Sequence, residues 1–145
     1  MKKISINLIV PIVAFFLIPS KIIAQGGWIS QNIPGQSTIL KNVYVFDVNT
    51  AIAVGDSGTI IKTTNGGTNW VSQTSGTSNM INSVYFVDSN TGWIVGRGST
   101  LLKTTNGGTN WVSQASQNYD PFYSVFFINL TTGWITGEDN TILKT

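Results

Sequence analysis

Residues 63–70 read Thr-Thr-Asn-Gly-Gly-Thr-Asn-Trp, and residues 104–111 repeat the same eight residues 41 positions later. The repetition extends outward, because the Val-Gly pair at 54–55 returns at 95–96 and reappears as Thr-Gly at 136–137. Each unit holds four short apolar runs separated by Gly, Asn and Thr turns, which is typical of one four-stranded blade of a β-propeller. The sequence therefore predicts an all-β fold of about three 41-residue blades of antiparallel strands.

The first strand of each blade is expected to be covered on both sides. In the central unit, Val84 and Phe86 fall on one face, and Tyr85 and Val87 fall on the other. A strand with one side in water would alternate apolar and polar residues, whereas this one is apolar throughout. We therefore expect it to lie between two neighbouring blades.

The repeated eight-residue stretch joins the third strand of a blade to the fourth. It matches the Asp-box pattern, Ser/Thr-x-Asp-x-Gly-x-Thr-Trp, with Asn in place of the usual Asp. A phosphate-binding loop would precede a helix, and a calcium loop would carry carboxylates, so a structural turn is the favoured interpretation. The residues expected to form these turns are Thr63, Asn65, Gly67, Trp70, Thr104, Asn106, Gly108 and Trp111.

Residues 1–24 have the pattern of a secretory signal peptide, with Lys residues at 2–3 followed by an apolar run over 4–19. A membrane anchor is the competing interpretation, but the run is shorter than the roughly 20 apolar residues of a spanning helix. We expect cleavage after Ala24, with no membrane span in the mature chain. The expected location is outside the cytoplasm, as a secreted, periplasmic or cell-surface protein.

Residues 25–145 are expected to form the propeller domain, with blades at about 32–73, 74–114 and 115–145. Residues 28–31 read Trp-Ile-Ser-Gln, like the start of the fourth strand in the first two units, and are expected to be a closing strand. Three blades are fewer than the four to eight of a closed ring. Two interpretations stay open, namely a partial propeller from a longer protein and half of a six-bladed ring formed by a homodimer.

The residue inventory excludes several classes of function. After residue 24, five basic and six acidic residues remain, so no clustered basic face for nucleic acid is expected. The chain contains no Cys and no His, which excludes disulfides, haem ligation and nucleophile–imidazole pairs. We expect no metal, no cofactor and no catalytic residue.

The repeat resembles that of the photosystem II assembly and stability factor family. The resemblance is carried by the Val-Tyr-Phe-Val-Asp-x-Asn-Thr-Gly-Trp-Ile-Val-Gly run at 84–96 and by residues 101–111, and it covers about residues 28–145. It implies a seven-bladed propeller that binds other proteins and has no catalytic centre. A link to photosynthesis rests on this resemblance alone, and similar repeats occur in secreted proteins of non-photosynthetic bacteria. Photosynthetic members hold their client with an arginine-rich patch, whereas this chain has one arginine, Arg97.

A binding site is expected on the rim that varies between repeats. The turns between third and fourth strands are nearly constant, whereas the turns between second and third strands differ, and loops that vary on a rigid scaffold are typical recognition elements. The candidate residues for binding a protein partner are Asp56, Arg97, Glu138, Met80 and Tyr119. The plainer interpretation is that the charged residues are solvated turn residues and that Tyr119 packs against a blade edge.

Two alternatives to protein binding stay open, a carbohydrate-binding propeller and a glycoside-hydrolase-like Asp-box propeller. Sialidase chemistry needs several arginines, and inverting hydrolysis needs two carboxylates about 6.5 to 9.5 Å apart. Asp56 and Glu138 could form such a pair, but no flanking motif supports it. Trp rings can stack on glycans, yet the tryptophans occupy repeated positions and are expected in the core.

Overall fold

The structure is a computed structural model that describes residues 27–31, 33, 37–116 and 121–145. The expected signal peptide and Tyr119 lie outside the described residues. The chain divides into two compact units, residues 1–30 and 31–145, and every described strand belongs to the second unit.

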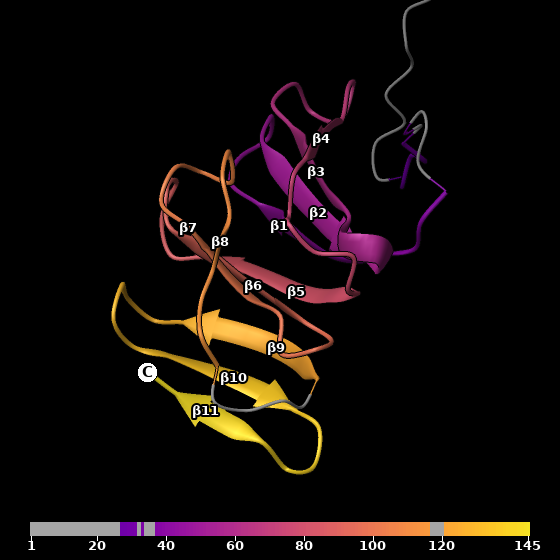
Figure 1. Ribbon diagram of the computed structural model, residues 1–145. Helices are drawn as coiled ribbons and strands as arrows, with labels where there is room; N and C mark the ends of the chain where they lie inside the picture. The colour runs from indigo at the N-terminus through magenta and orange to yellow at the C-terminus, as the bar shows by residue number, and fades with distance from the viewer. Residues whose placement is uncertain (1–26, 32, 34–36, 117–120) are drawn as a thin grey trace, which may run out of the picture. The chain divides into compact units, whose positions relative to one another are not determined.

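The strands form three consecutive antiparallel sheets, which we call blades 1, 2 and 3 (Figure 1). Blade 1 contains β1 (Leu40–Val45), β2 (Ala51–Gly55), β3 (Ile60–Thr63) and β4 (Val71–Gln73), with a single 3-10 turn, η1 (Asp56–Gly58). Blade 2 contains β5 (Ile81–Phe86), β6 (Gly92–Gly96), β7 (Leu101–Thr104) and β8 (Val112–Ser113). Blade 3 contains β9 (Phe122–Phe127), β10 (Gly133–Gly137) and β11 (Ile142–Lys144). The predicted all-β fold of propeller blades is confirmed.

The pairing register of the first two strands repeats from blade to blade. Tyr44 pairs with Ile52, Tyr85 with Trp93, and Phe126 with Trp134. Because the register is the same, residues 41 positions apart point in the same direction in each blade. Each blade therefore has a forward face, toward the next blade, and a rear face, toward the preceding one.

Two apolar clusters hold the three blades together. The first cluster joins the forward face of blade 1 to the rear face of blade 2 and includes Ile52, Val54, Phe86 and Ile94. The second joins the forward face of blade 2 to the rear face of blade 3, and Trp93 stacks there on Phe127 at 3.5 Å between ring centroids. Burial of apolar surface between sheets is thus the main stabilising contribution to the fold.

The innermost strand of blade 2 is covered on both sides, as predicted. Val84 and Phe86 belong to the first cluster, whereas Tyr85 and Val87 pack against the second. The apolar pattern of this strand therefore results from its position between two sheets.

The expectation that all tryptophans lie in the core is wrong for Trp28, which is fully exposed, and for Trp134. The Trp134 side chain is 37% exposed, whereas the equivalent Trp93 is 5% exposed. The physical reason is that Trp93 faces blade 3, while Trp134 lies on the forward face of blade 3, which no described blade covers.

Residues 28–31 do not lie in a strand, although the sequence predicts a closing strand there. A fourth strand is held by hydrogen bonds to a third strand, and β3 and β7 already pair with β4 and β8. The Trp28 side chain is fully exposed. The closing role of this segment stays a prediction.

Candidate functional site

The Asp-box turns are held by hydrogen bonds among their own residues. Thr63 Oγ1 donates to Asn65 Oδ1 at 3.0 Å, and the same Oδ1 accepts the N–H of Asn69 at 2.9 Å. The N–H of Gly67 donates to Thr63 Oγ1 at 3.0 Å. Thr104 and Asn106 repeat all of these bonds at the same distances. The Asn side chain thus supplies the acceptor oxygen that an Asp would supply, which supports a structural role.

The glycine and tryptophan of the second Asp-box face the first apolar cluster. Gly108 has φ +84°, and a Cβ there would lie 2.8 Å from Ile52 Cδ1. Trp111 packs edge-on against Phe86 with 5.8 Å between ring centroids. In the first Asp-box, a Cβ on Gly67 would lie 2.6 Å from Gln31 Oε1, and Trp70 is half-buried.

The Asp-box turns and the turns between first and second strands form one rim of the blades. The N–H of Gly66 donates to the Asn49 carbonyl, and the N–H of Gly107 donates to the Asn90 carbonyl, both at 2.8 Å. We call this side the Asp-box rim. Its turns differ little from blade to blade, so they are not suited to selective recognition.

Aspartates cap the turns between first and second strands on this rim. Asp47 Oδ1 accepts the N–H groups of Asn49 and Thr50, and Asp88 Oδ1 accepts those of Asn90 and Thr91. The bond from Asn49 holds the pKa of Asp47 below its ordinary value, and the bond from Thr91 does the same for Asp88. Both carboxylates are therefore used for local structure.

The opposite side, which we call the variable rim, is formed by the hairpins after β2, β6 and β10 and by the connections that precede β1, β5 and β9. The same backbone hydrogen bond recurs in each blade, at 2.8 to 3.0 Å. It runs from the N–H of Asp56, Arg97 and Glu138 to the carbonyl oxygens of Ile39, Met80 and Pro121, respectively. The three candidate charged residues thus occupy one column, and Arg97 is joined directly to Met80.

The hairpins of the variable rim share an unusual backbone that the sequence analysis did not identify. In each hairpin the two residues after the charged position have left-handed φ angles between +50° and +68°. Four of the six are not glycine, namely Ser57, Ser99, Asp139 and Asn140. Two successive left-handed residues are typical of a type I′ hairpin turn. The available signal was the recurrence of small and polar residues at these two positions.

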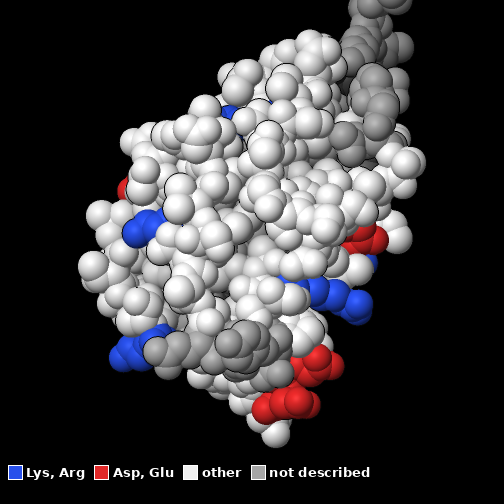
Figure 2. Space-filling model, in the orientation of Figure 1, with Lys and Arg blue, Asp and Glu red and all other residues white. Residues whose placement is uncertain are grey.

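The candidate side chains differ in their exposure and in their contacts. Asp56 is half-buried, and its Oδ1 lies 3.7 Å from the Lys41 ammonium. Arg97 and Glu138 are exposed, and Met80 is half-buried. Acidic and basic atoms follow one another along the right margin of Figure 2, on the side where Figure 1 shows η1 and the turn between β10 and β11. The rim is therefore of mixed charge.

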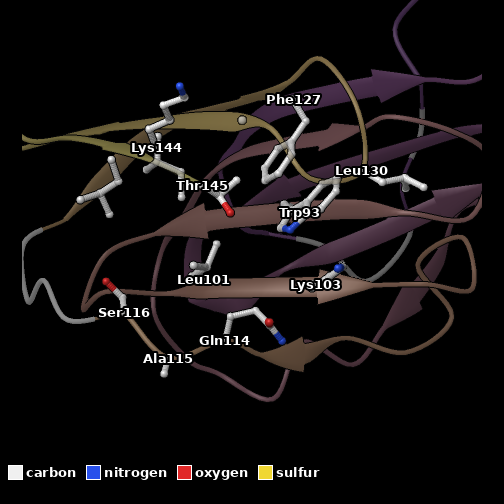
Figure 3. Close-up of a pocket in the computed structure, with 13 residues that line it drawn as sticks. Trp93, Leu101, Lys103, Gln114, Ala115, Ser116, Phe127, Leu130, Lys144 and Thr145 are labelled. Atoms are coloured by element: carbon white, nitrogen blue, oxygen red, sulfur yellow. The ribbon is translucent and has the colours of Figure 1, made fainter.

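A pocket of about 600 Å³ lies between blades 2 and 3, near the outer strands (Figure 3). Its wall includes Trp93, Phe127, Ile135 and Leu143. The Lys103 ammonium lies 5.2 Å from the Trp93 ring centroid and is a cation–π partner of that ring. The sequence analysis placed Trp93 in the core and missed the pocket.

Metal and membrane sites were sought in the described part of the chain. It contains no group of three or more Asp and Glu side chains close enough to hold a metal ion. Among these same residues, no helix has the length and apolar character needed to traverse a bilayer. The apolar segment at 4–19 lies outside them.

The chain is similar in fold to two solved structures. One is described as YCF48 bound to D1 peptide, with a TM-score of 0.69 and 24% identity over 78% of this chain. The other is YCF48 from Cyanidioschyzon merolae, with a TM-score of 0.65 and 19% identity over 75% of this chain. The chain spans 37% and 38% of the length of these proteins.

No curated protein matches the chain. The family described as Photosynthesis system II assembly factor YCF48 matches residues 21–121 and 77–145, which together cover most of the sequence. The repeated blades, the Asp-box turns and this match agree, and the chain belongs to the YCF48 assembly factor family.

Proposed function

We propose that this chain is an exported, non-enzymatic propeller module that binds a protein partner through the variable rim. The observation that carries the proposal is the contrast within the three rim hairpins. Their backbone is constant, with left-handed residues at the same two positions, while the side chains there are Ser-Gly, Gly-Ser and Asp-Asn. A constant scaffold with varied side chains is suited to recognition.

The energetics of the hairpins support the same interpretation. A left-handed conformation costs a residue other than glycine about 1 kcal/mol. Glycine at Ser99 or Asn140 would relieve this cost, yet these hairpins keep larger polar side chains. Residues other than glycine that are held in the left-handed region are concentrated at functional sites.

The solved structure described as YCF48 bound to D1 peptide supports a peptide-like partner for this fold. Arg97 is the one arginine of this chain, so these residues cannot form the arginine-rich patch that photosynthetic members use. The partner suited to this rim is a polypeptide segment with groups of both charges, facing Arg97 on one blade and Glu138 and Asp139 on the next. An export signal is expected at residues 1–24.

Site-specific photo-crosslinking tests this proposal. A photoreactive benzoylphenylalanine at Ser78, which is exposed on the variable rim and leaves Arg97 in place, is expected to cross-link a polypeptide when the chain is incubated with cell-envelope extract. Unlabelled chain in excess should compete, and Glu138→Ala with Asp139→Ala should reduce the adduct severalfold. The matched control is the same probe at Thr105, which is exposed on the Asp-box rim.

The proposal is overturned if positions 78 and 105 give equal adducts, or if neither gives an adduct. Binding to a glycan array or hydrolysis of a polysaccharide, without a protein adduct, would instead favour the carbohydrate-directed alternative. In that case Asp56 and Glu138 would be the first carboxylates to substitute.

A further inference from the structure

The two Asp-box turns contain the two Asn-Gly pairs of the chain, Asn65-Gly66 and Asn106-Gly107. These turns join β3 to β4 in blade 1 and β7 to β8 in blade 2 (Figure 1). At both positions, Asn stands where the Asp-box pattern has Asp. Both pairs lie on the Asp-box rim, so their chemistry is independent of the binding proposed for the variable rim.

An Asn that precedes Gly loses its side-chain amide without an enzyme. The backbone nitrogen of the Gly attacks Cγ of the Asn, a bond forms between these two atoms, and the bond from Cγ to Nδ2 breaks with release of ammonia. The product is a five-membered succinimide ring. Water then opens the ring at one of two bonds: cleavage of the bond to Cγ gives Asp, and cleavage of the bond to the backbone carbonyl carbon gives isoaspartate. Glycine favours the attack because it has no side chain to hinder the approach of its nitrogen.

The closed turn restrains both reacting groups. In the second turn, the N–H of Gly107 donates to the Asn90 carbonyl at 2.8 Å. Asn106 Oδ1 accepts the Thr104 hydroxyl at 3.0 Å and the N–H of Asn110 at 2.9 Å. Attack requires the Gly107 nitrogen to lose its proton and the Asn106 side chain to be free to turn. The first turn makes the same bonds, so at both sites the reaction needs a local opening of the turn.

The reactive side chains are accessible, whereas the base of the turn is not. Asn65 and Asn106 are exposed to solvent, so water can reach the ring once it has formed. By contrast, Thr104 is 1% exposed and Gly108 is buried. Opening of the turn, rather than access of water, therefore limits the reaction.

The folded turn accommodates Asp but not isoaspartate. The bonds that hold the Asn106 side chain use its Oδ1, so they are retained when an oxygen replaces Nδ2. Isoaspartate adds one carbon atom to the main chain before Gly107. This atom would displace Gly108, whose N–H donates to Thr104 Oγ1 at 3.0 Å. Gly108 has little room to move, because even a Cβ on it would lie 2.8 Å from Ile52 Cδ1.

We propose that Asn65 and Asn106 are sites of spontaneous deamidation, that the reaction proceeds through the open turn, and that Asp is the product with which the turn closes again. Each conversion adds one negative charge to the Asp-box rim. It also gives the turn the acidic residue of the Asp-box pattern. The side chains of the variable rim are unchanged.

The dependence on folding is tested by incubating the full chain at mildly alkaline pH, in buffer and in guanidinium chloride. Peptide mapping by mass spectrometry then measures conversion at each Asn. Asn65 and Asn106 are expected to convert at least about tenfold more slowly in the folded chain than in the denatured chain. Asn110 is the matched control, because it lies in the same turn as Asn106 but precedes Trp111. In denaturant it should convert far more slowly than Asn106.

The two turns serve as controls for each other in a second test. Thr104→Val removes the hydroxyl that holds Asn106 and keeps the shape of this buried side chain. Deamidation of Asn106 in the folded variant is expected to rise severalfold, while Asn65 in the same chain keeps its rate. Thr63→Val should have the reverse effect.

The double variant Asn65→Asp with Asn106→Asp represents the fully converted chain. It should fold, and its melting temperature at neutral pH should be close to that of the unsubstituted chain. Chains that carry isoaspartate, isolated after conversion in denaturant and returned to buffer, should melt at a lower temperature.

The contrary results each overturn the proposal. Equal rates in the folded and denatured chains would show that the turn does not control the reaction. A rise at both sites, or at neither, in Thr104→Val and in Thr63→Val would show that the hydrogen bonds of each turn do not govern its opening. A converted chain that fails to fold would exclude Asp as the product that the turn accommodates.

Discussion

At the level of single residues, the structure distinguishes residues that stabilise the fold from residues that are available for recognition. Trp111 contacts Phe86 and the first apolar cluster, so its ring stabilises the interface between blades 1 and 2. Arg97 is exposed, and its backbone rather than its side chain makes the recurring hydrogen bonds of the hairpin. The two residues should therefore respond differently to truncation.

Trp111→Ala is expected to lower the free energy of unfolding by about 3 kcal/mol, because it removes a half-buried aromatic ring and leaves a cavity. Arg97→Ala is the control and should change it by less than about 0.5 kcal/mol. Denaturant unfolding followed by circular dichroism measures both values. Equal losses would contradict the division between structural and recognition residues.

The capping aspartates predict a pH dependence. Because the pKa values of Asp47 and Asp88 are lowered in the folded chain, their contribution is present above the ordinary value of 3.8 and is lost as the pH falls below it. In blade 3, Asn129 makes the same bonds to the N–H groups of Thr131 and Thr132.

The double variant Asp47→Asn with Asp88→Asn should therefore fold and should lose less stability between about pH 4 and pH 2 than the unsubstituted chain. Thermal melts across this range check the result. A decline as steep as that of the unsubstituted chain would show that other groups control acid unfolding.

At the level of elements, the hairpins and the connections between blades are tied together on the variable rim. The N–H of Gly58 donates to the Asn79 carbonyl at 2.8 Å, and Asn79 Nδ2 donates to Thr100 Oγ1 at 3.3 Å. These bonds join the hairpin of blade 1 and the hairpin of blade 2 to the same connection. The rim is therefore a continuous, preorganised surface, which reduces the entropy lost on binding.

Gly58→Ala should be the more harmful of two glycine substitutions in this region. Gly58 has φ +68°, and a Cβ there would clash with the Thr77 carbonyl oxygen and lie 2.8 Å from Ser75 Oγ. Gly76 has φ +76° but nothing within 4 Å of its Cβ position. We expect Gly76→Ala to cost about 1 kcal/mol and Gly58→Ala at least about 2 kcal/mol, measured by denaturant unfolding. Similar costs would mean that the backbone conformation alone, and not the close approach of Thr77, requires glycine at 58.

For the whole molecule, the blades depend on one another for burial. Two apolar clusters join each sheet to its neighbour, so the free energy of folding comes mainly from the surfaces between blades.

The blades and their turns could be predicted from the sequence alone, because both depend on interactions between residues that are close together in the chain. The apolar pattern of 84–87, the 41-residue period and the Thr-Asn-Gly turns are local, and each copy makes the same hydrogen bonds. The column of Asp56, Arg97 and Glu138 could also be predicted, because an exact repeat places equivalent residues in equivalent positions. The small and polar residues of the hairpins were not a sufficient signal for their left-handed backbone, since Ser and Asp adopt it only where the flanking strands require it.

Only the tertiary structure decided which surfaces are covered and which are open. Trp93 and Trp134 are equivalent in sequence, but one is buried by blade 3 and the other is exposed. Likewise, the pocket beside β11 and the ion pair of Lys41 with Asp56 result from contacts between segments that no local pattern specifies. A repeat determines the structure of each unit, whereas burial depends on the neighbour that each unit meets in space.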